Sequence, residues 1–327
     1  MSTGSPGLLL GDDLKCALQS LHRKAMLGSK MSHSATELTA MADALQQSGN
    51  YRVLRRLIPR GLSKPPAGNS KIGILLDFET TGLDTANDEV IEIGMVKFTY
   101  SDLGEVTAVV DIFSSFNQPS KSIPPEITAL TGITDEIVKG HRIDADALTS
   151  FVSDADIVIA HNANFDRKFA ERSWSIFAEK CWGCSANEIE WRKHGFDGSR
   201  LGYLLAGAGY FHEAHRAVED CQALLEILAQ KLPKTHQTAL SVLLERARRT
   251  TFRIWAERSP FDLKGELKRR GYRWNDGNDG RPKAWYVDVS EDQRDKELKF
   301  LKQNIYQRDV DLYTQSVTAA SRFSVRA

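Results

Sequence analysis

One apolar run constrains this chain more than any other segment. Residues 72–76 (Ile-Gly-Ile-Leu-Leu) form an uncharged run of strand length, and such runs suit a strand that is covered on both faces. The run leads directly into Asp77-Phe78-Glu79. Because side chains at positions i and i+2 of a strand point to the same side, the sequence predicts two neighbouring carboxylates where a buried strand ends.

The segments that follow predict a mixed sheet with helices. Strands are expected over residues 90–100, 106–116 and 156–160. The turn residues Asp102 to Gly104 join the first two of these strands into a hairpin. Helices are expected over residues 165–177, 200–206 and 214–232. Strands in hairpin order, followed by a strand that alternates with helices, are typical of an α/β fold with a mixed sheet.

The region before this middle unit is predicted to be helical. Within residues 11–59, apolar residues recur at helical spacing in two groups: Leu14, Leu18 and Leu21, and then Leu38, Met41 and Leu45. The polar run Ser32 to Ser34 can cap the second helix. Pro65-Pro66 and Gly68 indicate a linker before the apolar run.

The region after Pro233 is predicted to form a basic helix and a small α+β module. The basic helix is expected over residues 238–255. The module comprises a helix over 263–270, aromatic strands over 272–274 and 284–287, a hairpin turn over 275–280 and a last helix capped by Ser290. The predicted organisation is an N-terminal helical region and linker (residues 1–69), a middle domain (70–232) and a C-terminal region (233–327).

The net charge of the chain is zero, but its charges are unevenly divided. Residues 1–70 carry +5, residues 71–232 carry −12 and residues 233–327 carry +7. This division indicates either a carboxylate-rich site beside a polyanion or unequal solvated faces. No stretch approaches the roughly 18 apolar residues of a membrane span, and four cysteines in 327 residues make no disulfide framework. We therefore expect a cytoplasmic protein without a membrane partner.

Two further carboxylates follow comparable signals. Asp166 ends the segment His161-Asn-Ala-Asn-Phe-Asp directly after the predicted strand 156–160, and Asp220 lies on the predicted helix 214–232, five residues after His215. Four carboxylates held together beside apolar elements would repel one another unless cations neutralise them. Oxygen ligands select hard cations such as Mg²⁺ or Mn²⁺.

These motifs resemble those of the DEDDh 3′–5′ exonucleases, a proofreading-subunit-like family. The resemblance rests on Asp-Phe-Glu-Thr-Thr-Gly (77–82), His-Asn-Ala-Asn-Phe-Asp (161–166) and the His215/Asp220 pair, in that order, with Ile-Thr-Ala-Leu-Thr-Gly-Ile-Thr (127–134) between the first two. It covers residues 71–232, about half of the chain. In the related tyrosine class a Tyr precedes the last Asp by four residues, and that position holds Arg216 here. The likeness is to a bacterial, stand-alone type with extra terminal regions.

The resemblance implies a fold, a reaction and a set of site residues. The fold is ribonuclease H-like, a mixed five-stranded sheet flanked by helices, and the reaction releases 5′-mononucleotides from a 3′ end with two divalent cations, Mg²⁺ or Mn²⁺. Asp77 would bridge both ions, Glu79 and Asp220 would complete one shell, Asp166 would act directly or through water, and His215 would be the general base. Implied substrate contacts are Phe78, Thr80, Thr81 and Leu83, with Thr80 and Leu83 holding the 3′ nucleotide, and Asn162 and Phe165 shaping the site.

Other motifs have plainer interpretations. His161 and His212 are expected to be structural or to lie at the rim, rather than to form a metal pair with His215. Cys181 and Cys184 have zinc-like spacing, but a zinc site needs about four ligands and the sequence has no second such pair, so free thiols are favoured. In the C-terminal module, Tyr272, Trp274, Trp285 and Tyr286 lie among arginines and lysines, either to stack on single-stranded nucleic acid or to form a small core with a basic rim. The core is favoured for Trp274 and Trp285.

The leading hypothesis is a metal-dependent exonuclease that acts on single-stranded DNA 3′ ends. Alternatives are an RNA-directed, oligoribonuclease-like enzyme and a proofreading subunit bound to a DNA polymerase or repair partner. A non-catalytic nucleic-acid binder is disfavoured because every motif position is present. The basic flanks are expected to capture substrate, so residues 70–232 alone are expected to keep the chemistry and lose affinity.

Overall fold

A computed structural model describes residues 33–68, 70–278 and 280–326 of the chain. The chain divides into two compact units after Val53. In the described part of the first unit, α2 (Ala35–Gln47) begins at the N-cap Ser34, whose side chain accepts from the main chain of Glu37 in a reciprocal capping box. This confirms the predicted cap. The helix expected at Leu14 to Leu21 lies outside the described residues.

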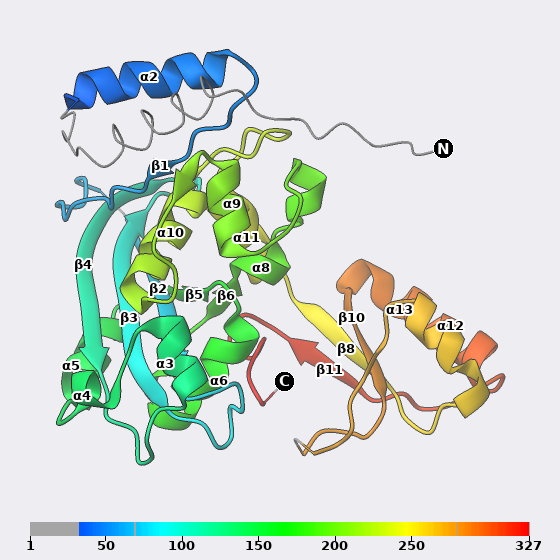
Figure 1. Cartoon of the computed structure of the whole chain (residues 1–327). Coiled ribbons are helices and arrows are strands. Elements are labelled where there is room, and N and C mark those ends of the chain that lie inside the picture. Colours follow the sequence, from blue (N-terminus) through cyan, green and yellow to red (C-terminus); the bar gives the residue numbers. More distant parts are fainter. Residues whose placement is uncertain (1–32, 69, 279, 327) are drawn as a thin grey trace, which may run out of the picture. The chain divides into compact units, whose positions relative to one another are not determined.

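A five-stranded mixed sheet forms the centre of the second unit (Figure 1). Its strands are β2 (Lys71–Thr80), β3 (Val90–Tyr100), β4 (Val106–Phe116), β5 (Ile157–Ala160) and β6 (Trp182–Cys184), in the spatial order β4-β3-β2-β5-β6. β2, β3 and β4 pair antiparallel, whereas β5 is parallel to β2 and β6 is parallel to β5. The predicted hairpin and the ribonuclease H-like fold class are confirmed; β6 was not predicted.

Helices cover both faces of this sheet. They are α3 (Pro125–Thr131), α4 (Asp135–Val138), α5 (Ala145–Val152), α6 (Ala163–Ser173), α7 (Ile176–Glu179), α8 (Ser185–Glu188), the 3₁₀ turn η1 (Trp191–His194), α9 (Leu201–Gly207), α10 (Ala217–Ala229) and α11 (Ala239–Arg248). A short parallel pair joins β1 (Arg55–Arg56) to β7 (Tyr210–Phe211), so residues 55–56 are strand and not helix.

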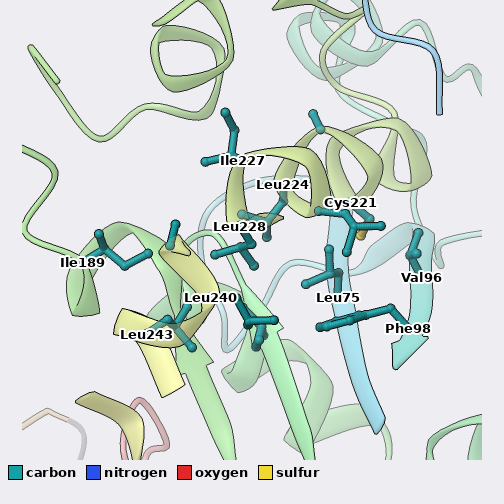
Figure 2. Packing of buried hydrophobic residues seen from close by; sticks show 14 of the residues in the cluster. Leu75, Val96, Phe98, Ile189, Cys221, Leu224, Ile227, Leu228, Leu240 and Leu243 are labelled. Atoms are coloured by element: carbon teal, nitrogen blue, oxygen red, sulfur yellow. The ribbon is translucent and has the colours of Figure 1, made fainter. Parts of the chain in front are cut away.

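The apolar run of β2 is buried on both sides, as its composition predicts. Leu75 belongs to a cluster with Leu224 of α10 and Leu240 of α11 (Figure 2), whereas Ile74 and Leu76 point to the opposite face and join a cluster with α5 and α6. All three β2 side chains are inaccessible to solvent. The strand that carries Asp77 and Glu79 is therefore fixed from both faces.

A second, antiparallel sheet forms in the C-terminal region. Its strands are β8 (Thr251–Ala256), β9 (Arg273–Trp274), β10 (Trp285–Ser290) and β11 (Thr314–Val317), in the spatial order β11-β8-β10-β9. The helical elements are η2 (Phe261–Leu263), α12 (Lys264–Arg269), α13 (Glu291–Phe300) and the π turn η3 (Leu301–Ile305). The β9–β10 hairpin confirms the predicted α+β module.

Two expectations for the C-terminal region are wrong. The predicted helix 238–255 ends at Arg248, and its second half is β8, which pairs with both β10 and β11. Those partners lie far along the chain, so local spacing could not reveal the strand. Trp274 is 51% exposed and lies outside the core, whereas Tyr272 is buried in it. Trp285 packs against this core while half-buried.

The last residues of the described chain return to the five-stranded domain (Figure 1). The carbonyl oxygen of Ala319 accepts a 2.9 Å hydrogen bond from the main-chain N–H of Trp182 on β6. Ser324 donates a 2.6 Å bond to Glu171 of α6. Residues 319–326 thus contact elements far before them in the sequence. Among the helices of the described segments, none is long and apolar enough to cross a bilayer.

Candidate active site

Three of the predicted carboxylates meet at the end of the buried strand. Asp77 and Glu79 lie on β2 and point to the same side, and Asp220 approaches from the first turn of α10. One carboxylate oxygen from each residue can be chosen so that the three atoms lie within 4.8 Å of one another. Metal ions in proteins are held by Asp, Glu, His and Cys side chains. Within the described residues, these three acids are the group of such side chains whose ligand atoms are close enough to share an ion.

The fourth predicted carboxylate, Asp166, is buried beside this group. It lies in the first turn of α6 and is 3% exposed. Main-chain hydrogen bonds from Phe78 and from Asp166 itself stabilise its carboxylate. Asp166 is not one of the three residues with atoms within 4.8 Å, but its charge acts on both Asp77 and Glu79. The structure therefore gathers all four predicted acids at one edge of the sheet.

Burial and mutual repulsion make this site receptive to positive charge. Burial is the main cause that raises the pKa of Asp77 well above its ordinary value, and the charges of Asp166 and Asp220 add to it. Burial, with Asp220 and Glu92 next, raises the pKa of Glu79 to about 8. Burial raises the pKa of Asp166 to about 7. Bound cations would relieve this repulsion and favour the ionised carboxylates.

A glycine allows α10 to bring Asp220 to the other acids. Gly94 pairs with Asp77 across β2 and β3. A Cβ at Gly94 would overlap main-chain atoms of Ala217 and Val218 at the start of α10. An isolated glycine inside a strand is the sequence signal for such a close approach, and the sequence analysis did not use it.

His215 lies in the loop before α10, because the helix begins at Ala217 and not near residue 214 as expected. Its backbone is in the left-handed region, with φ 67°. The main-chain N–H groups of His215 and Arg216 donate bonds of 2.8 and 3.1 Å to Oδ2 of Asp220. The His215 side chain is exposed.

His212 also contacts Asp220. Its Nε2 lies 2.9 Å from Oδ1 of that carboxylate, and the His212 side chain is nearly buried. The contact places His212 beside the site rather than in a metal pair with His215. The carboxylate of Asp220 is thus held through both of its oxygens.

An ion pair between buried Glu92 and half-exposed Arg216 anchors the His215 loop to the sheet. Glu92 lies opposite Glu79 on β3 and is 2% exposed. It accepts a 3.1 Å bond from Nη2 of Arg216 and a 3.2 Å bond from the main-chain N–H of Ala217. Sequence reasoning missed this pair, because no local spacing links residues that are 124 positions apart.

The side chains of the predicted substrate contacts differ in how accessible they are to a substrate. Phe78 is buried against Trp174, with ring centroids 6.0 Å apart, and buried Thr80 donates to the carbonyl of Gly82. Their side chains therefore face the protein. Leu83 is 84% exposed, and Asn162 is exposed at the start of α6.

Thr81 and Phe165 are intermediate between these two groups. The Thr81 hydroxyl contacts Asp88 at 3.2 Å and accepts from the main chain of Glu89. Phe165 is half-buried, with its ring centroid 4.9 Å from that of Phe169. The functional roles assigned to all six substrate-contact residues stay predictions.

The remaining motifs fit their plainer interpretations. Nδ1 of His161 lies 2.8 Å from the hydroxyl of Ser185, and burial lowers the pKa of this histidine. Cys181 and Cys184 are free thiols. The segment 275–280, where the turn was expected, lies in the connection between β9 and β10, and its residue 279 is outside the described residues.

Comparison with protein families identifies the middle of the chain. Residues 74–228 match the exonuclease family RNase_T. The matched segment is thus similar to an exonuclease domain, and it includes all five residues that the sequence motifs assign to catalysis. For residues 74–228, this match confirms the prediction of an exonuclease and the prediction of its fold class.

Curated relatives match the same part of the chain. A DNA polymerase III PolC-type from Caldanaerobacter subterraneus subsp. tengcongensis is 33% identical over 187 residues, which are 53% of this chain and 13% of that protein. Its counterpart from Thermotoga maritima is 29% identical over 202 residues, which are 57% of this chain and 14% of that protein. The chain thus spans about one seventh of the length of these relatives.

Two solved structures are similar in part. Exonuclease X, in complex with 5′ overhanging duplex DNA, has 22% identity and a TM-score of 0.38, covering 52% of this chain and 99% of that one. Exonuclease I from E. coli, in a complex with single-stranded DNA, has 14% identity and a TM-score of 0.47, covering 68% of this chain and 63% of that one.

Proposed function

We propose that the exonuclease domain of this chain is a metal-dependent 3′–5′ exonuclease that removes 5′-mononucleotides from single-stranded DNA. The observation that carries the proposal is the meeting of Asp77, Glu79 and Asp220 within 4.8 Å, beside buried Asp166, inside a domain that matches an exonuclease family. A structural role alone would not require four acids to lie together at the carboxyl end of β2, where their charges repel one another.

The donor set fits hard divalent cations. Every candidate ligand is a carboxylate oxygen, which suits Mg²⁺ or Mn²⁺ better than softer metals. Asp77, Glu79 and Asp220 would hold such ions, with Asp77 shared between two of them, and Asp166 would act directly or through a bound water. When bound, such ions lower the pKa of water and stabilise charge on the phosphate and the leaving oxygen.

The side chains of the chain supply the remaining parts of the reaction. Water oxygen bonds to the phosphorus of the terminal phosphodiester, and the bond from that phosphorus to the 3′ oxygen of the next nucleotide breaks. We assign the proton of the attacking water to the imidazole of His215, because an imidazole can accept a proton near neutral pH and so suits a general base. The 3′ oxygen gains a proton from solvent. Main-chain hydrogen bonds from His215 and Arg216 to Asp220 support this assignment, because they fix the backbone of the His215 loop beside that carboxylate.

DNA is the proposed substrate because the curated relatives are named DNA polymerases and the flanking regions carry a net positive charge. The test uses matched DNA and RNA oligonucleotides, labelled at the 5′ end, with Mg²⁺ or Mn²⁺. We expect a ladder that shortens from the 3′ end on DNA. Faster shortening of RNA would favour the oligoribonuclease-like alternative. Loss of the 5′ label as a mononucleotide before any ladder forms would refute the 3′–5′ polarity.

A second candidate is a proofreading role with a polymerase. The names of the curated relatives favour it, because this chain matches about one seventh of proteins named as DNA polymerases. Co-elution of the full chain with a DNA polymerase, together with faster removal of mismatched than of paired 3′ ends, would support this role. Equal rates on both ends and separate elution would count against it.

A further inference from the structure

An arginine-lined cleft lies between the exonuclease domain and the C-terminal sheet. Its volume is about 510 Å³. One wall comes from Asn162, Asn164 and α8, and the other comes from β8 and β10 with Tyr286. Five arginines line it: Arg246, Arg253, Arg273, Arg281 and Arg322. We call this feature the arginine cleft.

The charge of the arginine cleft is positive. Its acidic lining residues are Glu188 and Asp288, so two carboxylates face five guanidinium groups that stay charged in proteins. Asp288 is shared, because it accepts bonds from Nε of Arg253 at 2.7 Å and from Nη2 of Arg273 at 2.8 Å. Glu188 is engaged by Nη1 of Arg322 at 2.5 Å. The lining therefore keeps an excess of positive charge, which suits an anion.

The guanidinium groups are held in place. Arg253 and Arg322 are 7% and 9% exposed and form the floor. The Arg253 and Arg273 guanidinium carbons each lie 4.8 Å from the centre of the Tyr286 ring. Arg246 and Arg273 are exposed at the rim. Buried arginines fixed by carboxylates and an aromatic ring present donors without a large entropic cost on binding.

The arginine cleft is continuous with the loop that leads to the carboxylate site. Asn162 and Asn164 line the cleft and are exposed. Asn162 is the N-cap of α6 and Asn164 lies in its first turn, which also carries Asp166. A polyanion that occupied the cleft would therefore run toward the acids, although the exonuclease domain alone is strongly acidic and would repel it.

We propose that the arginine cleft binds the phosphates of a single nucleic-acid strand whose 3′ end occupies the carboxylate site; this rests on the proposed exonuclease function. The volume of about 510 Å³ lies within the range of pockets that hold drug-sized ligands. The polar, cationic lining suits phosphates, which dominate nucleic-acid affinity.

The experiment measures binding of the full chain to fluorescent oligothymidylate by anisotropy, in chelator so that no turnover occurs. The test variant is Arg246→Glu/Arg273→Glu, which changes two exposed rim residues. The matched control is Arg269→Glu, because Arg269 is equally basic, 71% exposed and outside the cleft lining. Circular dichroism of each variant checks the fold.

We expect the double variant to bind a strand of about twelve nucleotides at least tenfold more weakly, and to lower the slope of log affinity against log salt by about two. Binding of a trinucleotide should change far less, and the control should match the wild type. An unchanged affinity and salt slope in the double variant would overturn the inference, as would an equal loss for a blunt duplex of the same length.

The two proposals fail separately. A chain that binds through the arginines but releases no nucleotide when Mg²⁺ or Mn²⁺ is added would refute the exonuclease function and leave the cleft assignment standing. A chain that shortens DNA while the double variant binds as tightly as the wild type would refute the cleft assignment alone.

Discussion

Nη1 of Arg167 donates a 2.7 Å hydrogen bond to the carbonyl oxygen of Arg322, 155 residues later in the chain. Arg167 follows Asp166 on α6 and is inaccessible to solvent. The carbonyl oxygens of Ala319 and Ala320 accept two more bonds from the same guanidinium, at 3.0 and 2.6 Å. A buried charge beside a candidate metal ligand is therefore satisfied by the C-terminal end of the described chain.

Deletion of residues 318–327 should destabilise the exonuclease domain. Arg167 would lose three carbonyl partners and keep one ion pair, to Glu171, and breaking a buried network costs roughly 3–5 kcal/mol. Urea unfolding measures the change, with Arg308→Ala, at an exposed position, as the control.

For the same reason the fragment 70–232 should lose activity, against the expectation from sequence. A fragment as stable and active as the full chain would contradict this account of the tail.

Gly94→Ala should separate Asp220 from Asp77. The added methyl group would overlap the main chain at the start of α10, so the helix must shift or the strand must bend, at a cost of roughly 1–3 kcal/mol. We expect weaker Mn²⁺ binding by calorimetry as well as a lower Tm. Gly202→Ala is the matched control, because nothing lies within 4 Å of a Cβ at that position. Equal Mn²⁺ affinity in both variants would argue against the packing role of Gly94.

His215→Asn tests the general base with little backbone strain, since Asn tolerates the left-handed conformation of residue 215. We expect kcat to fall by roughly 10²–10⁴ with little change in KM. His212→Asn removes one hydrogen bond to Asp220 and should mainly weaken cation binding. Steady-state rates across pH distinguish the two. If His212→Asn abolished the pH dependence and His215→Asn kept it, the roles would be reversed.

Stability and cation binding should depend on pH in opposite ways. The pKa of Glu79 is raised to about 8 and that of Asp166 to about 7, whereas unfolded carboxyls titrate near 4. Without cations the folded state binds more protons than the unfolded state across this window, so its stability falls as pH rises from about 4 to 8. Cation binding needs the ionised carboxylates, so it strengthens with pH and releases protons.

Thermal unfolding in chelator and in Mn²⁺, from pH 5 to pH 8, measures both trends. The rise in Tm caused by Mn²⁺ should be larger at pH 8. Glu79→Gln cannot ionise and should flatten the dependence in chelator relative to the wild type. A dependence in chelator that is identical in Glu79→Gln and the wild type would contradict the raised pKa of Glu79.

The sequence predicted those strands, turns and site residues that depend on a few neighbouring positions. The apolar run of β2, the β3–β4 hairpin and the motif order predict the sheet and the four acids, because side-chain period and turn chemistry act over a few residues. It misassigned β8, whose pairing partners lie in β10 and β11. It also could not foresee the contacts of Arg167 with Arg322 or of Arg216 with Glu92. Those contacts depend on distant segments folding together.

The most direct test of the account is the release of mononucleotides from single-stranded DNA by the full chain and by Asp77→Asn, with Mn²⁺ and with chelator. Asp111→Asn, an exposed position on β4, is the control. We predict Mn²⁺-dependent release of 5′-mononucleotides by the wild type and the control, and at least a hundredfold loss in Asp77→Asn, in line with removal of a transition-state charge stabiliser. Release that persists in chelator, or in Asp77→Asn, would contradict the assignment of the carboxylate group as a metal-dependent catalytic site.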